Sequence, residues 1–347
     1  MKTTINFFVA ILVLFSIISC NVKPKVEPVQ KTDVSDFLGQ WTIDISGGLV
    51  GWLEVRQEKN YLDADLLWVG GSVLPVADVY LANDKYLIVT RTDNVVRTKD
   101  ANNAPVRSHI ITKWLVAEKK GDKITGFFFS PHINGIGVDS ISFTGIKLLP
   151  PPPAPDLSKL KFGTPVTLFN GKDLAGWRLT DEKKKNGWVV ANGILSNDPV
   201  QAEGAKHVSY GNLRTDKEFE DFNLKLEVNV PAGSNSGIYL RGMYEIQVYD
   251  SYKKELDPHN MGAVYSRIKP TVSAEKPAGT WQSFDITLCD RHATIILNGI
   301  KIIDNQPIYG PTGGAIKWDV FAPGPLYLQG DHGKVEYRNI VLTPVIK

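Results

Sequence analysis

The chain has 347 residues, 43% of them hydrophobic, and a formal net charge of +2. That length is enough for two domains that each bury a core. The charges form no long basic run, which excludes a nucleic-acid partner of the kind that needs a basic stripe. The sequence also contains no heptads, no helical repeat and no phosphate-loop or dinucleotide fingerprint.

Residues 1–20 have the features of a bacterial lipoprotein signal peptide. Lys2 supplies the positive start, and the apolar run of residues 5–18 is too short to span a bilayer comfortably. The run ends at Cys20 in a pattern that resembles a lipobox, whose cysteine is acylated, so we expect an exported lipoprotein in the periplasm or at the cell surface. Residues 21–36 would be a polar tether. An ordinary signal peptide or an N-terminal anchor is the alternative.

Cysteine usage limits the covalent chemistry. The chain has two cysteines, Cys20 and Cys289. If Cys20 carries lipid, no intramolecular disulfide can form. Cys289 lies in an alternating run, which predicts a small buried residue rather than a catalytic thiol.

Residues 33–149 are predicted to form an all-β domain. Its short alternating runs are separated by Gly, Asn and Asp turn signals, which is typical of a small barrel or sandwich. The sequence Gly39-Gln40-Trp41 is similar to the start of lipocalin-like barrels, so the domain could hold a ligand or be a packed accessory domain. Lone histidines His109 and His132 are predicted to be structural or solvated. The expected strands are residues 42–45, 51–57, 61–68, 76–81, 86–91, 109–119, 123–130 and 140–148.

Residues 150–160 are predicted to be a linker. Four consecutive prolines, Pro150 to Pro153, and a fifth at Pro155 favour a stiff polyproline spacer.

Residues 161–347 are predicted to form a two-sheet jelly-roll sandwich. Apolar residues alternate with polar ones over 222–230, as in a strand with one buried face. The run 294–303 contains Asn298-Gly299, which suits a tight hairpin turn. Many short strands with such turns in one domain are typical of a sandwich.

Polar side chains cluster within residues 235–250. If this segment is a hairpin, Glu245, Gln247 and Tyr249 share one strand face, and Asn235 and Arg241 lie nearby. Carboxylate and amide groups bind sugar hydroxyls and aromatic rings cover sugar rings, so this face suits a carbohydrate site. An exposed polar strand face is the alternative.

Two further segments carry candidate site residues. Gln329, Asp331 and His332 precede a glycine turn, and His332 could act as an acid or base near neutral pH. Tyr265 and Lys269 could line a pocket, or be a packed tyrosine and a solvated lysine. His207 and His259 lack metal-ligand spacing, so no metal site is predicted.

Residues 164–344 resemble the 3-keto-disaccharide hydrolase domain family, a concanavalin-like jelly roll common in exported bacterial proteins. Gln282 follows Trp281 where the family more often has asparagine, and residues 33–149 are not covered. The matching positions are 168–177, 188, 192–193, 213–215, 219, 221–222, 235–238, 241, 244–245, 247, 250, 262–265, 276–277, 281, 297–299, 328–333 and 338–340.

The resemblance implies substrates that are glycosides oxidised to a ketone at C3. Such a ketone acidifies the C2 hydrogen, so the bond could break by elimination followed by hydration. This route does not need the paired carboxylates of ordinary glycosidases. On this reading Glu245 is the general base or acid, Arg241 stabilises the enolate, and His332 is the second proton carrier. No redox cofactor is expected, and a separate partner oxidoreductase would make the ketone. The substrate-binding candidates are Asn235, Gln247, Asp250, Tyr265, Lys269, Gln329 and Asp331.

Two other functions remain open. A conventional endoglucanase-like glycosidase could pair Glu245 with Asp250, although strand alternation puts residues five apart on opposite faces unless a bulge intervenes. The other is a glycan-binding module without catalysis. In every case the expected partners are a glycoside or oligosaccharide and, through the lipid, a membrane.

Overall fold

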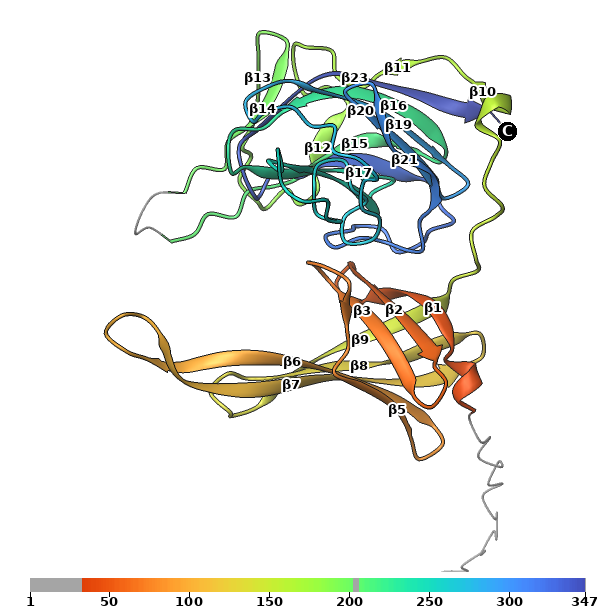
Figure 1. The fold of residues 1–347 in the computed structure, drawn as a ribbon, viewed down its shortest axis with the longest axis vertical. Coiled ribbons are helices and arrows are strands. Elements are labelled where there is room, and N and C mark those ends of the chain that lie inside the picture. The colour runs from red at the N-terminus through yellow and green to blue at the C-terminus, as the bar shows by residue number, and fades with distance from the viewer. Residues whose placement is uncertain (1–32, 202–205, 347) are drawn as a thin grey trace, which may run out of the picture. The chain divides into compact units, whose positions relative to one another are not determined.

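The computed structural model describes residues 33–201 and 206–346, which form a chain of β-strands with two short 3-10 helices, η1 (Val34–Asp36) and η2 (Leu157–Lys159) (Figure 1). The predicted all-β class is therefore confirmed. Within the described residues no helix is long and apolar enough to cross a membrane. The predicted signal peptide, Cys20 and most of the tether lie outside the described residues. Thr32–Lys347 form one structural unit, so the division into two domains at residues 150–160 stays a prediction.

The first half of the described chain forms one nine-stranded antiparallel sheet, here named the N-terminal sheet. Its strand order is β4-β3-β2-β1-β9-β8-β7-β6-β5. The eight expected strands are present, most with bounds shifted by a few residues, and β4 is a ninth that was not predicted. They are β1 (Gly39–Ile45), β2 (Leu49–Gln57), β3 (Leu62–Trp68), β4 (Leu74–Pro75), β5 (Asp78–Ala82), β6 (Tyr86–Lys99), β7 (Pro105–Lys120), β8 (Lys123–Pro131) and β9 (Val138–Lys147).

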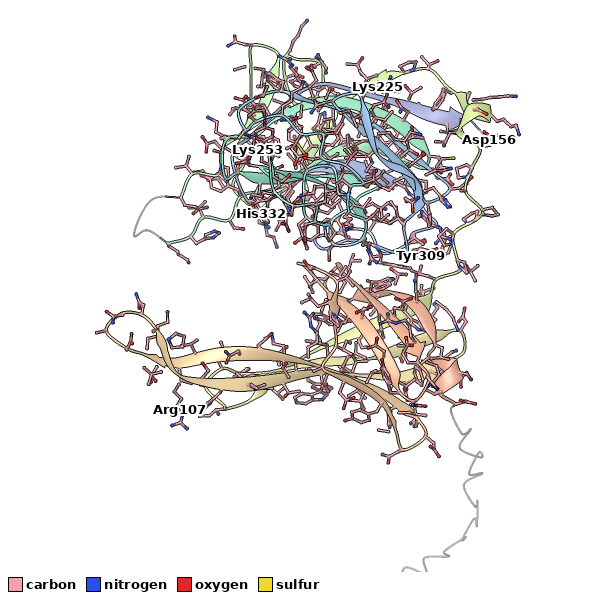
Figure 2. The ribbon with its side chains drawn as sticks, viewed as in Figure 1. Arg107, Asp156, Lys225, Lys253, Tyr309 and His332 are labelled. Atoms are coloured by element: carbon pink, nitrogen blue, oxygen red, sulfur yellow. The ribbon has the colours of Figure 1, made fainter. Side chains whose placement is uncertain are left out.

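The N-terminal sheet curls around its own apolar core. Trp41, Ile43 and Leu53 are fully buried in it, and the Trp41 indole N–H donates to the Phe37 carbonyl at 2.8 Å. β4 pairs with β3 and β5 pairs with β6, and between them the N–H groups of Val76 and Ala77 donate to the carbonyls of Ala64 and Thr90 at 3.1 and 2.8 Å. The likeness to a lipocalin barrel stays a prediction. The hairpin β6–β7 is longer than predicted, since residues 92–99 also pair with β7. Few of these residues have apolar side chains, so the sequence does not mark them as a strand. Arg107 is near its far end (Figure 2).

The proline-rich segment is tied to the strands that follow it. The Arg291 guanidinium donates to the carbonyls of Leu149 and Pro150 at 3.0 and 2.8 Å. The Asn305 amide donates to the Pro155 carbonyl at 2.9 Å. These bonds satisfy carbonyls that an extended polyproline chain otherwise leaves to water.

The second half forms two facing antiparallel sheets, here named the C-terminal sandwich. One sheet has the order β13-β14-β23-β16-β19-β20-β21, with β10 and β11 also paired to β23, and the other has the order β12-β15-β22-β17-β18. The strands are β10 (Lys161–Phe162), β11 (Val166–Thr167), β12 (Trp177–Leu179), β13 (Trp188–Ala191), β14 (Ile194–Asn197), β15 (Leu213–Phe219), β16 (Phe222–Asn229), β17 (Asn235–Leu240), β18 (Tyr244–Tyr249), β19 (Gln282–Cys289), β20 (His292–Leu297), β21 (Ile300–Pro307), β22 (Gly324–Leu328) and β23 (Val335–Ile346).

The core of the sandwich follows the alternation in the sequence. Phe222, Leu224 and Leu226 on β16 are buried against the facing sheet, as predicted. The predicted turn after β20 is present, with φ of 52° at Asn298 and 82° at Gly299, values that Asn and Gly tolerate. Cys289 is buried, which confirms its predicted environment.

Candidate functional site

A cavity of about 250 Å³ opens on the five-stranded sheet of the C-terminal sandwich. Its volume is close to the lower end of the range of about 300–1,000 Å³ usual for ligand sites, so it suits a small sugar. The lining residues are Gly70, Gly71, Asn212, Asn235, Tyr239, Glu245, Tyr265, Gly313, Gly314, Tyr327, Gln329, Asp331 and His332.

Strand alternation brings the central residues together. Asn235, Gly237 and Tyr239 occupy alternate positions of β17, and Tyr239 pairs directly with Glu245 on β18. A Cβ atom at Gly237 would lie 2.4 Å from Glu245 Oε1, so only glycine leaves room for this carboxylate. The local sequence therefore creates a slot for one acidic side chain.

Glu245 is the buried acid of this cavity. Glu245 is 4% exposed, and its Oε2 lies 2.8 Å from the Tyr239 hydroxyl. Burial raises the pKa of Glu245 from 4.5 to about 8, against the lowering effects of the Tyr239 hydrogen bond and the nearby His332. At neutral pH Glu245 is accordingly held in its protonated form, which can donate a proton.

Tyr239 connects Glu245 to the backbone. Its hydroxyl lies 2.8 Å from both Glu245 Oε2 and the Gly313 carbonyl. Because a hydroxyl has one proton, it can donate to Gly313 only while it accepts from protonated Glu245. Tyr327 stacks on Tyr239 with ring centroids 3.9 Å apart and donates to the Gly314 carbonyl at 2.8 Å. Burial raises the pKa of both tyrosines, so they stay neutral.

Asp331 and His332 form a second proton-handling pair in the loop between β22 and β23, where Figure 2 labels His332. His332 Nδ1 lies 2.7 Å from Asp331 Oδ1. This hydrogen bond raises the pKa of His332. The pKa of Asp331 is lowered, because the bond and charge of His332 outweigh the effect of burial. With Nδ1 bound to Asp331, the other ring nitrogen of His332 is left for the cavity.

Amide groups complete the lining. Asn235 Oδ1 and Gln329 Oε1 are buried and have no hydrogen-bond donor within the described residues. Buried acceptors of this kind cost free energy unless a ligand supplies the donor. Sugar hydroxyls are suitable donors. Asn212, also in the lining, uses its Oδ1 to accept from the Gly330 N–H at 2.8 Å.

The structure separates Arg241 from the other catalytic candidates. Arg241 is 3% exposed and donates through Nη2 to the carbonyls of Val320 (2.8 Å) and Ala322. It lines another pocket, with Asp221 and Arg291, and not the cavity that contains Glu245. The reason is the turn after β17, where Arg241 has a φ of 55° and leaves the strand alternation. Its expected role as enolate stabiliser is therefore not supported by its position.

Three predicted substrate-binding residues also lie outside the lining. Gln247 is buried beside the site on β18, and its Oε1 has no partner among the described residues. Asp250 accepts the Gly233 N–H at 2.9 Å, and Lys269 is exposed. The carboxylates of Glu245 and Asp250 do not share the cavity, so the geometry gives no support to a glycosidase pair made from them.

Several lining residues were not predicted from the sequence. Tyr239 continues the alternation that begins at Asn235, and Tyr327 continues the one that contains Gln329, so strand periodicity could have found both. For Asn212, and for the glycine pairs at residues 70–71 and 313–314, the sequence gives no signal of position.

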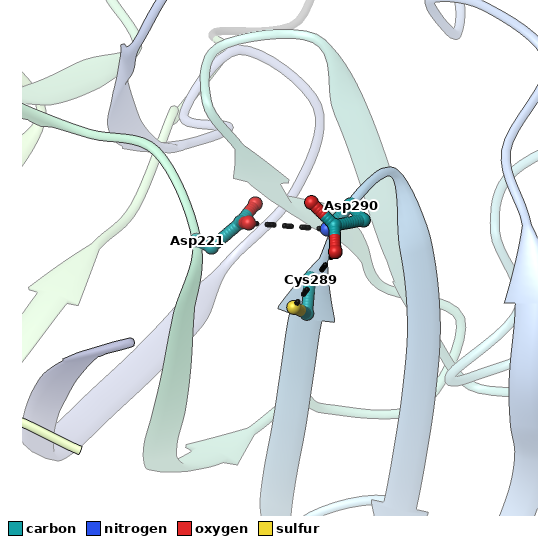
Figure 3. A group of neighbouring side chains, drawn as sticks. All are labelled: Asp221, Cys289 and Asp290. Atoms are coloured by element: carbon teal, nitrogen blue, oxygen red, sulfur yellow. Dashed lines mark hydrogen bonds between the residues drawn. The ribbon is translucent and has the colours of Figure 1, made fainter. Parts of the chain in front are cut away.

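One group of potential metal ligands occurs within the described ranges, made of Asp221, Cys289 and Asp290 (Figure 3). Asp221 Oδ2 accepts the Asp290 N–H at 3.1 Å, and Cys289 Sγ lies 3.8 Å from Asp290 Oδ2. These contacts stabilise the tight turn after β19, where Asp290 and Arg291 have φ of 47° and 59°. The group orders the fold and is not part of the cavity.

Comparison with known proteins gives one family match. A family model described as a 3-keto-alpha-glucoside-1,2-lyase-like domain matches residues 164–343. A crystal structure from Parabacteroides distasonis, described provisionally as a glycosyl hydrolase, is 27% identical with a TM-score of 0.41 and covers 55% of this chain and 92% of that chain. A second from the same organism, with the same description, is 23% identical with a TM-score of 0.41, over 52% and 94% of the two chains. A non-specific endo-beta-1,3(4)-glucanase is 12% identical with a TM-score of 0.35, over 56% and 93%. No curated protein matches the chain.

Proposed function

This chain belongs to the family of 3-keto-alpha-glucoside-1,2-lyase-like domains, and on that premise we propose that its cavity binds a glycoside with a ketone at C3 and breaks the glycosidic bond by elimination. The membership itself supports a carbohydrate-acting enzyme. The observation that carries the specific proposal is a single buried acid, Glu245, in one cavity with the Asp331–His332 pair.

In the proposed reaction, the free ring nitrogen of His332 removes the C2 proton. The ketone takes up the electron pair as an enolate, and the new imidazolium is stabilised by Asp331. The imidazolium charge would also balance the enolate, the part first expected of Arg241.

Glu245 then protonates the departing oxygen as the C1–O bond breaks. The enolate electrons form the C1=C2 double bond and restore the C3 ketone, giving a 2-hydroxy enone and a free alcohol or sugar. Addition of water across C1 and C2 completes a net hydrolysis. The raised pKa of Glu245, about 8, favours the acid role at neutral pH.

Neither step oxidises or reduces the substrate overall. A separate oxidoreductase must therefore make the ketone before the glycoside reaches this protein, and the proposed chemistry uses no redox cofactor here. The residues proposed to hold sugar hydroxyls are Asn212, Asn235, Tyr265 and Gln329.

The direct test compares matched glycosides with and without the C3 ketone. Purified protein is incubated with a 3-keto-glucoside and with the unoxidised glucoside, and the released alcohol is measured. We expect release from the keto compound and none from the parent. Equal or faster cleavage of the parent would instead indicate a conventional glycosidase.

The unpartnered acceptors of Asn235 and Gln329 would serve a glycan-binding module equally well. Saturable binding of both glycosides with no product from either would favour that function. The same assay therefore separates the two candidates.

We also propose export and anchoring through an acylated Cys20. This rests on the apolar run that precedes the cysteine in the sequence. Labelling of expressing bacteria with a palmitate analogue should mark the wild-type chain and leave Cys20→Ala unlabelled.

A further inference from the structure

One wall of the cavity comes from outside the matched residues 164–343. Gly70 and Gly71 line the cavity, and both belong to the turn between β3 and β4 of the N-terminal sheet. Residues 69–73 are here named the β3–β4 turn. Nothing in the proposed chemistry uses this turn.

The β3–β4 turn is held in an unusual conformation. Val69 has a φ of 69°, which a β-branched residue adopts only when its surroundings impose it. Its carbonyl accepts the Gly314 N–H at 3.2 Å. A Cβ atom at Gly313 would lie 2.1 Å from the Gly71 carbonyl oxygen, so the two backbones pack with no side chain between them. The turn therefore packs against Gly313 and Gly314, whose carbonyls accept hydrogen bonds from Tyr239 and Tyr327.

A polar chain fixes the far side of the same turn. Ser72 Oγ lies 2.9 Å from His259 Nε2, and His259 Nδ1 lies 2.5 Å from Asp257 Oδ1. With Nδ1–H donating to Asp257, Nε2 accepts the Ser72 hydroxyl proton. The His259 ring also packs edge-on against Tyr265, with centroids 4.9 Å apart. Since Tyr265 lines the cavity, the chain holds the turn and this tyrosine together as one wall.

A second contact secures the segment that follows. The Val73 N–H donates to Ser266 Oγ at 3.0 Å, and the Val73 side chain packs against the core of the C-terminal sandwich. The turn is thus anchored at Val69, Ser72 and Val73, while Gly70 lies between anchors. A Cβ atom at Gly70 would meet nothing within 4 Å, and its φ is not in the left-handed region. A side chain is therefore tolerated by the protein at this position, at the expense of space in the cavity.

We propose that the β3–β4 turn is the size-determining wall of the sugar cavity, which admits a larger glycoside only because residues 70 and 71 are glycines. The proposal rests on the proposed function for the class of ligand, a glycoside with a C3 ketone. It makes the N-terminal sheet a part of the binding site.

The test is a Gly70→Leu variant assayed with a methyl 3-keto-glucoside and with a 3-keto-disaccharide. Asn102→Leu, in the exposed turn after β6, is the matched control. We expect Gly70→Leu to raise KM for the disaccharide about tenfold or more, with the methyl glycoside changed less than about threefold. Asn102→Leu should change neither. Unchanged values for both substrates in Gly70→Leu, or equal changes for both, would overturn the proposal.

Binding measurements separate this proposal from the proposed reaction. If the wild type turns over neither keto substrate, the reaction is wrong, and calorimetric titration with the same two sugars still tests the wall. A selective loss of disaccharide binding in Gly70→Leu supports it, and equal affinities refute it.

If Gly70→Leu does not fold, Ser72→Ala provides a second test. Loss of the bond to His259 should increase amide hydrogen exchange in residues 69–73 and weaken disaccharide binding, while exchange in β6 stays constant. Exchange and binding that both match the wild type would show that the turn is not held as a wall.

Discussion

The Tyr239 hydroxyl lies 2.8 Å from Glu245 Oε2 across the paired strands β17 and β18. This contact joins the one buried carboxyl group of the cavity to a tyrosine that burial keeps neutral. The arrangement allows Glu245 to hold a proton, to lose it in the reaction and to accept a hydrogen bond afterwards. The proposed role of Glu245 as proton donor rests on this geometry.

Replacement of Glu245 by glutamine should lower kcat for a 3-keto-glucoside about 100-fold or more, with KM little changed. Proton transfer by a positioned group contributes about 10²–10⁴-fold, and glutamine keeps the shape but not the acid. Asp250→Asn is the matched control, because Asp250 bonds Gly233 outside the cavity. Release of the leaving group measures both variants. Loss of activity in Asp250→Asn with normal activity in Glu245→Gln would reverse the assignment.

The free energy of unfolding should depend on the protonation of Glu245. Its pKa rises from 4.5 to about 8 on folding. Between these values the folded protein keeps a proton that the unfolded chain releases, so the free energy of unfolding falls as pH rises. Below about pH 4.5 Glu245 causes no such loss of stability, and above about pH 8 the loss is complete.

Glu245→Gln removes this pH-dependent loss of stability, because glutamine does not titrate. The Tm of the variant minus that of the wild type should therefore increase steadily from pH 5 to pH 8.5 in thermal unfolding. A difference that stays constant over this range would mean that Glu245 has an ordinary pKa in the folded protein.

Asp331→Asn should move the acidic limb of the kcat/KM profile to lower pH. Asp331 raises the pKa of His332 through their hydrogen bond, and a neutral His332 is the proposed base. An NMR titration of the His332 ring should show the same shift. Asp139→Asn is the control, because Asp139 raises the pKa of His132 in the N-terminal sheet. The proposed base is wrong if the His332 titration moves and the rate profile does not.

Gly237→Ala should displace the Glu245 carboxylate. The added Cβ atom would lie 2.4 Å from Glu245 Oε1, and such overpacking costs about 1–3 kcal/mol. We expect a lower Tm together with a loss of kcat of about tenfold or more. In Gly163→Ala the nearest atom is 3.7 Å away, an ordinary contact, so Tm and kcat should match the wild type. Normal kcat in Gly237→Ala would show that the position of this carboxylate is not critical.

Much of the fold could be predicted because strand alternation is a local signal. The period-two pattern over β16 and the Asn298-Gly299 turn each depend on neighbouring residues alone. How the ends of the N-terminal sheet meet could not be predicted, since this depends on β4 and β5, which have only two and five residues. The length of the β6–β7 hairpin was missed because its outer half has few buried side chains to mark it.

The candidate site could be predicted in part for the same reason. Asn235 and Glu245 lie on paired strands, so their shared face follows from register. Arg241 could not be placed, because a turn residue with positive φ breaks the alternation that the prediction used. Gly70 lies far away in the sequence, and only the tertiary structure brings it to the cavity.

The proposed mechanism requires removal of the C2 proton, and isotopic substitution at that carbon is a direct test of this step. A 3-keto-glucoside carrying deuterium at C2 is incubated with the enzyme, and the sugar product and rate are measured by mass spectrometry and NMR. We predict a slower reaction than with the protium compound and a product that has lost its C2 deuterium to water. Release of the leaving group at an unchanged rate, with the deuterium fully retained at C2, would contradict it.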